Sequence, residues 1–137
     1  MSPRLHHIGY AVADAAEYIR DFLQPLFGPV EVGEAYEDPV QGVRVRFVTI
    51  RPGSLIELVE PLHDDSPIRK VIGSARGGYY HVCYEVDDLD EELRRFRGKR
   101  CLPLGKPVGA VAFGGRRIVF LMTPQHDLIE LVEAPTA

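Results

Sequence analysis

The sequence predicts an α+β fold in which two tandem βαβββ modules form one open, partly closed β-barrel-like sheet. Three observations predict it. The chain has 137 residues, the length of a single domain. Its two halves share short stretches of sequence at a nearly constant offset. In each half, signals for a strand, a helix and three further strands follow one another in the same order.

The composition excludes several classes of protein. Hydrophobic residues make up 45% of the chain and charged residues 26%, which is typical of a soluble globular domain. The net charge of −4 leaves no basic surface for nucleic acid. No apolar run is long enough to span a membrane or to form the core of a signal peptide. The two cysteines, Cys83 and Cys101, have no metal or redox spacing. We therefore expect a cytoplasmic enzyme or a small-molecule-binding protein.

An internal repeat divides the chain. Residues 56–60, Ile-Glu-Leu-Val-Glu, recur letter for letter as residues 129–133, an offset of 73 (129 minus 56). Further matches in the same order pair Phe47 with Phe120, residues 7–12 with 81–86, and residues 14–17 with 88–91. Ordered matches within one residue of a common offset indicate two fused copies of one module. The single domain, residues 1–137, would then consist of a module over about 1–62, a connector over about 63–78 and a module over about 79–137.

Each module is expected to begin with a strand that leads into a helix. The first strand covers residues 5–12, and its counterpart covers residues 79–86. The helices start at Asp14 and Asp88, whose carboxylates can accept hydrogen bonds from the free N–H groups of the first turn. Apolar residues at helical spacing predict the buried faces, which are Ala15, Tyr18, Ile19, Phe22 and Leu23 in the first helix and Leu89, Leu93 and Phe96 in the second.

Three strands complete each module. Alternating apolar residues bounded by Gly and Pro predict them at residues 30–35, 41–51 and 54–60, and again at residues 103–111, 116–122 and 127–132. Turns between them are expected at Pro52-Gly53, at Gly114-Gly115 and at residues 123–125. The connector is expected to hold a helical turn around residues 67–72.

A histidine on the first strand and a glutamate on the last strand recur in both modules. The repeat pairs His7 with His81, and Glu57 with Glu130. If a pseudo-twofold axis relates the modules, these four side chains meet in one metal cleft. Two imidazoles and two carboxylates suit a divalent ion such as Zn, Co, Ni, Mn or Fe.

Simpler structural roles stay open for each of these residues taken alone. A strand histidine is often only hydrogen-bonded in place, and a glutamate in an amphipathic strand is often only solvated. The alternation of side chains along a strand is compatible with the metal site. It lets Glu57 and Glu130 point into a cleft while the second glutamate of each strand, Glu60 or Glu133, points away.

Several stretches together resemble one known family. They are residues 5–12, 56–62, 65–68, 80–90, 118–121 and 128–131. In this order they resemble the vicinal oxygen chelate superfamily, which has the glyoxalase I fold, and within it the methylmalonyl-CoA epimerases. The resemblance implies a divalent metal ion (Co, Zn, Ni or Mn) held by His7, Glu57, His81 and Glu130. It also implies that the substrate is a small carboxylic acid or its acyl-CoA thioester.

The resemblance further implies a metal-dependent isomerase that works through an enolate. Glu130 would be both a metal ligand and the base that removes the α-proton. Epimerisation needs a second proton carrier, and the epimerase pattern has a glutamate immediately before its Gln-Gly-Val element, where this chain has Val40. Asp38, on the same strand face if the segment is extended, and Glu37 are the nearby substitutes.

Other functions stay open from the residues alone. Another metal-dependent enzyme of the superfamily, such as a glyoxalase-type isomerase, a lyase or a cyclase, fits the same four ligands. A non-catalytic protein that binds a small molecule or confers resistance is the alternative outside the enzymes. An open sheet leaves unpaired edges that a second copy could cover, so a homodimer is also open.

Overall fold

The computed structural model describes residues 2–72 and 77–136, which divide into two compact units. The first unit contains residues 7–80, and the second contains residues 81–136 together with the N-terminal residues 2–6. Strand residues 4–6 therefore belong to the second unit, although the first strand continues into the first unit. Among the described residues, no helix is both long and apolar enough to cross a membrane.

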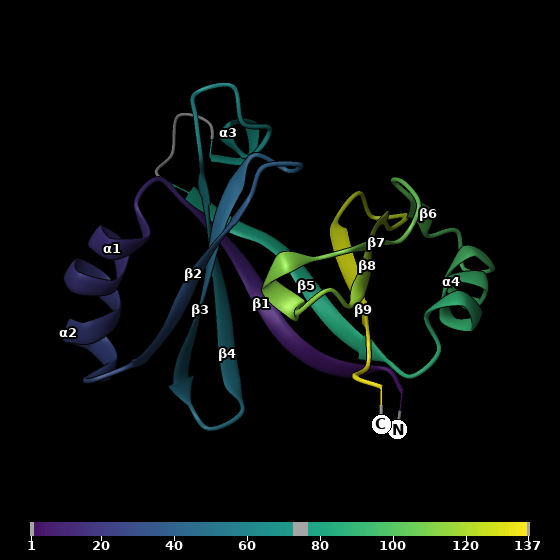
Figure 1. The fold of residues 1–137 in the computed structure, drawn as a ribbon, viewed down its shortest axis with the longest axis horizontal. Coiled ribbons are helices and arrows are strands. Elements are labelled where there is room, and N and C mark those ends of the chain that lie inside the picture. The colour runs from purple at the N-terminus through teal and green to yellow at the C-terminus, as the bar shows by residue number, and fades with distance from the viewer. Residues whose placement is uncertain (1, 73–76, 137) are drawn as a thin grey trace. The chain divides into compact units, whose positions relative to one another are not determined.

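The first unit contains a four-stranded sheet and short helices (Figure 1). Its elements are β1 (Arg4–Val12), α1 (Ala15–Tyr18), η1 (Ile19–Leu23), α2 (Gln24–Phe27), β2 (Glu31–Asp38), β3 (Val43–Arg51), β4 (Ser54–Pro61) and α3 (Ile68–Ile72). The strand order is β2-β3-β4-β1. The first two pairs are antiparallel, and β4 and β1 are parallel.

The second unit repeats this plan with shorter strands in its middle. Its elements are β5 (Gly77–Val86), α4 (Leu89–Arg97), β6 (Leu102–Pro103), β7 (Val108–Gly109), η2 (Val111–Phe113), β8 (Arg117–Met122) and β9 (Leu128–Glu133). The order is β5-β9-β8-β6, and β7 also pairs with β8. The pair β5–β9 is parallel and the others are antiparallel. The predicted α+β class is confirmed. The strand pairing is mixed, and within the described residues neither set of strands closes on itself.

Each unit has its own apolar core, and its helix covers one face of its strands. In the first unit, Ile19 and Leu23 pack with Val48 and Leu58. In the second unit, the buried cluster consists of Val86, Leu89, Cys101, Val119, Leu121, Ile129 and Leu131, with Leu93 and Phe96 packed against it. The helix faces predicted from Leu89, Leu93 and Phe96 are therefore confirmed.

The first helix differs from the prediction at Phe22. This side chain is 46% exposed, whereas Ala15, Ile19 and Leu23 are buried. The reason is the π-helical stretch η1, which follows α1 directly. A π-turn adds a residue to the turn, so the spacing of buried positions becomes four and Phe22 rotates out of the core.

The predicted strand over residues 103–111 is also wrong. The structure has only the two-residue strands β6 and β7 there, followed by the 3₁₀ turn η2. Pro103 and Pro107 lack the backbone donor that a continuous ladder needs, and Gly105 separates them. The helical turn expected in the connector is present as α3.

The predicted starts of both main helices are confirmed. Asp14 Oδ1 accepts a hydrogen bond from the backbone N–H of Glu17 at 3.0 Å. Asp88 Oδ1 accepts one from the N–H of Glu91 at 3.1 Å. The turn at Gly114-Gly115 requires glycine because both residues have positive φ, 64° and 91°.

Candidate functional site

One histidine–glutamate pair lies in the first unit. His7 comes from β1 and Glu57 from β4, and the parallel register sets Glu57 beside Gly9, two residues after His7. His7 Nε2 lies 3.5 Å from Glu57 Oε1. Both residues are buried, at 1% and 5% exposure. The ring of Phe47, the register partner of Glu57 on β3, contacts the imidazole edge-on at 5.2 Å between centroids.

The second unit holds a pair built in the same way. His81 comes from β5 and Glu130 from β9, with Glu130 paired in register to Cys83, again two residues after the histidine. His81 Nε2 lies 3.1 Å from Glu130 Oε1, and the two residues are 1% and 3% exposed. Phe120, the register partner of Glu130 on β8, meets the imidazole edge-on at 5.4 Å.

The chemistry of these pairs suits a metal ion. Imidazole nitrogens and carboxylate oxygens are both ligands of divalent transition ions. Burial of such groups is costly unless they are paired or bind a metal, and each pair already turns a nitrogen and a carboxylate oxygen toward one another. The structure thus brings each predicted histidine to its predicted glutamate within its own unit. Phe47 and Phe120 were not predicted to contact the pairs, although the repeat had matched them with one another.

The second glutamate of each last strand points away from these pairs, as the alternation predicts. Glu60 Oε2 accepts a hydrogen bond from the N–H of Ala15, and its Oε1 from Arg44 at 3.3 Å. Glu133 accepts from the backbone N–H and the guanidinium of Arg117. Glu60 therefore supports the start of α1, and Glu133 supports the start of β8.

Asp38 was expected to share a strand face with Val40 only if this segment were extended. The structure shows that the segment around Val40 is not extended. Val40 is 92% exposed in the turn over residues 39–42, and β2 ends at Asp38. Asp38 Oδ1 accepts a hydrogen bond from the N–H of Gln41 and so closes this turn. The carboxylate of Glu37 binds Arg44 at 2.9 Å at an exposed position. Pro39 starts the turn, since a proline cannot donate to the strand ladder.

The sequence reasoning missed an acidic residue on the strand of His81. Glu85 follows His81 and Cys83 at alternate positions of β5, so the three side chains share one face of the strand. Glu85 forms ion pairs with Arg116 at 2.9 Å and with Arg4 at 3.0 Å. Strand alternation alone could have placed Glu85 on this face, but its arginine partners are distant in sequence.

Comparison with known proteins agrees with this geometry. Residues 6–120 match the family model of the Glyoxalase/Bleomycin resistance protein/Dioxygenase superfamily. The chain belongs to this superfamily. It is 36% identical to the ethylmalonyl-CoA/methylmalonyl-CoA epimerase of Cereibacter sphaeroides, covering 96% of this chain and 98% of that protein. It is 34% identical to the mitochondrial methylmalonyl-CoA epimerase of Bos taurus, covering 96% of this chain and 74% of that protein.

A solved structure extends the likeness to three dimensions. It is a variant of the Streptomyces coelicolor methylmalonyl-CoA epimerase in complex with 2-nitronate-propionyl-CoA. It matches with a TM-score of 0.80 and 28% identity, covering 97% of this chain and 98% of that chain. The resemblance to the superfamily and to its epimerases, inferred from the sequence motifs, is confirmed.

Proposed function

We propose that this protein is a metal-dependent epimerase that acts on methylmalonyl-CoA or a closely related acyl-CoA. Its likeness to epimerases covers nearly the whole chain, and one such relative binds an acyl-CoA analogue. The observation that carries the proposal is the repeated pair, a buried histidine beside a buried glutamate in each unit. An acyl-CoA epimerase removes a weakly acidic proton from the α-carbon of its substrate. A positioned carboxylate can accept that proton as a general base.

His7, Glu57, His81 and Glu130 would together hold one divalent ion. Two nitrogen and two oxygen donors suit Co, Zn, Ni or Mn, and the two buried pairs supply donors of these kinds. When bound, such an ion supplies Lewis-acid chemistry by stabilising negative charge on substrate oxygens. The edge-on rings of Phe47 and Phe120 would keep water away from the histidines.

Glu130 would remove the proton from the α-carbon of the substrate. It is nearly fully buried on β9, which pairs with β5, and its Oε1 lies 3.1 Å from His81 Nε2. The abstracted proton stays on Glu130, so a second group must deliver a different proton to the opposite side of the carbon.

Glu57 would be that second proton carrier. It occupies in the first unit the position that Glu130 occupies in the second, beside a histidine and a phenylalanine. Asp38 and Glu37 are weaker candidates, since one closes a turn and the other is ion-paired at an exposed position. The repeat thus supplies one acid–base residue from each unit.

Solvent isotope exchange tests this function directly. Purified protein in deuterium oxide is expected to introduce deuterium at the α-carbon of methylmalonyl-CoA and to interconvert its two epimers. Removal of metal by a chelator should abolish both, and Co²⁺ or Zn²⁺ should restore them. Exchange that survives complete metal removal would contradict the metal-dependent mechanism, and no exchange in the metal-loaded protein would exclude this substrate.

Metal analysis of the purified protein separates the enzyme from a non-catalytic binding protein. One bound divalent ion per chain is expected, and it should be lost in His81→Ala. A metal-free protein whose affinity for acyl-CoA is unchanged by chelators would favour simple binding instead. A cytoplasmic location and a homodimer stay predictions, and light scattering of the purified protein measures the latter.

A further inference from the structure

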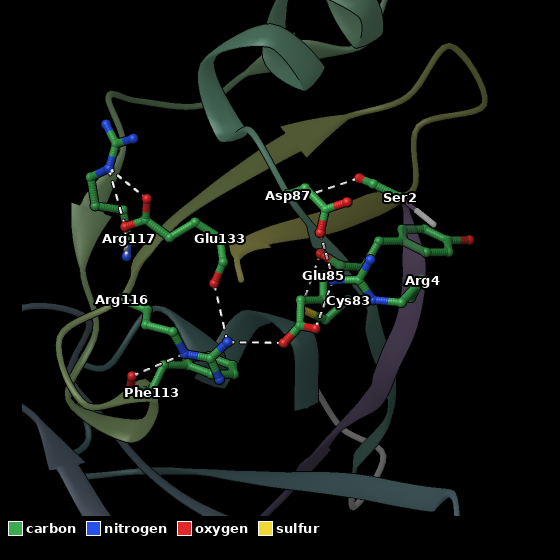
Figure 2. Close-up of polar contacts among 10 residues, drawn as sticks. Ser2, Arg4, Cys83, Glu85, Asp87, Phe113, Arg116, Arg117 and Glu133 are labelled. Atoms are coloured by element: carbon green, nitrogen blue, oxygen red, sulfur yellow. Dashed lines mark hydrogen bonds and ion pairs between the residues drawn. The ribbon is translucent and has the colours of Figure 1, made fainter. Parts of the chain in front are cut away.

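An ion-pair network lies on the strand that carries His81. Arg116 Nη1 donates to Glu85 Oε2 at 2.9 Å, and Arg4 Nη2 donates to Glu85 Oε1 at 3.0 Å (Figure 2). Arg4 also pairs with Asp87 at 3.0 Å. Each oxygen of Glu85 therefore has an arginine partner. We call Arg4, Glu85 and Arg116 the Glu85 network.

The two central members of the network are largely shielded from water. The side chains of Glu85 and Arg116 are 20% and 24% exposed. Burial acts to raise the pKa of Glu85, but the hydrogen bonds from Arg116 and Arg4 outweigh it, so the pKa lies below its ordinary value. The carboxylate is charged at neutral pH, and its pairing to Arg116 persists there.

Arg116 connects this strand to the loop over residues 110–116. Its Nε donates to the carbonyl oxygen of Phe113 at 3.3 Å, and its Nη1 also donates to the carbonyl oxygen of Glu133 at 3.1 Å (Figure 2). The guanidinium lies over the Phe113 ring, 5.5 Å from its centroid. One arginine thus joins β5, the end of β9 and the loop.

The backbone of the 110–116 loop is not rigid by itself, so the contacts of Arg116 matter for its conformation. It contains η2 and the glycine pair Gly114-Gly115, which gives its backbone wide conformational freedom. Its tip residue Phe113 is nevertheless buried, and its ring contacts His6 edge-on at 5.3 Å. Because Arg116 binds both the ring and the carbonyl of Phe113, it holds this side chain in one place.

The network lies on the same side of the strands as the His81–Glu130 pair. On β5, His81 and Glu85 share a face because they are four residues apart. On β9, Glu130 and Val132 are register partners of Cys83 and Glu85, so the same face continues there. Along a strand, four residues span about 13 Å, less than the length of an extended acyl-pantetheine chain.

The repeat shows that the fold does not require this ion pair. The position of Glu85 in the first unit is taken by Ala11 (85 minus 74) and that of Arg116 by Val43 (116 minus 73). Both are apolar and buried, at 0% and 6% exposure. A partly buried ion pair gives little stability over an apolar pair, so its presence in one unit only calls for another role.

We propose that Arg116, held by Glu85, is a positioning residue that fixes Phe113 as one wall of the substrate site. This inference rests on the proposed acyl-CoA site at His81 and Glu130. A substrate bound there extends along the face of β5 toward the 110–116 loop, and the fixed Phe113 ring packs against its acyl or pantetheine portion. Arg116 acts through Phe113 and does not take part in proton transfer.

The test compares two neighbouring arginines. Arg116→Met removes the support of the loop, whereas Arg117→Met removes an arginine whose partners are Glu133 and Asp90. We expect Arg116→Met to raise KM for methylmalonyl-CoA about tenfold, the size of one lost hydrogen bond to a charged group, with kcat changed less than about twofold. Metal content should stay at one ion per chain. Arg117→Met should leave KM unchanged.

A second measurement does not depend on activity. Amide hydrogen exchange in the peptide covering residues 110–116 should speed up in Arg116→Met and in Glu85→Gln but not in Arg117→Met. Phe113→Ala should raise KM by a similar factor, and combining it with Arg116→Met should add little, since both remove the same wall. Glu85→Gln, which keeps the shape of the side chain, serves if Arg116→Met does not fold.

Two results would overturn the inference. One is equal loop exchange in the two arginine variants. The other is a fall in kcat or metal content in Arg116→Met with KM unchanged. If the wild-type protein neither binds nor exchanges methylmalonyl-CoA, the proposed function fails, while the exchange data on residues 110–116 still decide whether Arg116 fixes the loop.

Discussion

The two units keep the same residues at the histidine–glutamate pairs and differ elsewhere. Each has a histidine on its first strand, a glutamate on its last strand and a phenylalanine against the imidazole. The first unit then has long strands β2 and β3 and a helix interrupted by a π-turn. The second has two-residue strands, a glycine-rich loop and the Glu85 network. Under the proposed function, the units agree at the residues that would carry the chemistry and differ in the segments around them.

The largest expected effect concerns the two glutamates. Glu130→Gln should slow epimerisation by about 100-fold or more, because general-base catalysis contributes that much. Glu57→Gln should slow it comparably but leave α-proton exchange with solvent for the epimer that Glu130 deprotonates. Deuterium incorporation measured separately on each epimer distinguishes the variants. If both variants lose exchange on both epimers equally, the two glutamates do not act on opposite sides of the carbon.

Next in size is the loss of a core leucine in each unit. Leu58 and Leu131 are repeat mates and are both fully buried. Leu58→Ala and Leu131→Ala should each lower the free energy of unfolding by about 2–5 kcal/mol, because each leaves a cavity. Urea unfolding followed by circular dichroism measures both losses. A loss below about 1 kcal/mol in one variant only would show that its unit contributes little to the cooperative core.

The helix caps should give a smaller and unequal effect. Asp14→Ala and Asp88→Ala each remove one hydrogen bond to a helix start, worth about 1 kcal/mol. The first helix has a second acceptor, because Glu60 binds the N–H of Ala15, so Asp14→Ala should cost less than Asp88→Ala. Thermal unfolding of the two variants provides the comparison. The reverse order would mean that Glu60 does not support the helix start.

The smallest effect is the dependence of stability on pH that Glu85 of the second unit should cause. The pKa of Glu85 is below its ordinary value of 4.5, so the folded state binds fewer protons than the unfolded chain. The stabilising contribution is therefore complete above that ordinary value and is lost as the pH falls through the lower folded pKa. The stability difference between wild type and Glu85→Gln should shrink on acidification. Glu31→Gln, which removes a carboxylate at an exposed position of β2, is the matched control.

The sequence allowed the site pairs to be predicted because the repeat carries them. Two copies of one pattern single out His7 with Glu57, and His81 with Glu130, and both main helix caps follow from local chemistry. The prediction that Phe22 lies on the buried helix face was wrong, because a π-turn changes the helical period without any signal in the residue types. The prediction of one strand over residues 103–111 was wrong because it followed the apolar residues and neglected the two prolines.

Long-range pairing was the part that local patterns could not predict. Arg4 and Glu85 are 81 positions apart in the chain, and Arg116 reaches the same carboxylate from a third segment. Charged residues of this kind are usually solvated, so their types alone indicate an exposed surface. Only the folded strands show that Arg4 and Arg116 both reach Glu85.

The assignment of residues 2–6 to the second unit bears on how the protein could be divided by engineering. A gene cut within the connector would leave Arg4 on the first fragment, although its partners Glu85 and Asp87 would be on the second. The second fragment would then lack Arg4, which pairs with one oxygen of the partly buried Glu85 carboxylate. A circular permutant that begins at His81 and joins the native termini would instead keep each folding unit continuous, because its chain would pass from one unit to the other at His6–His7.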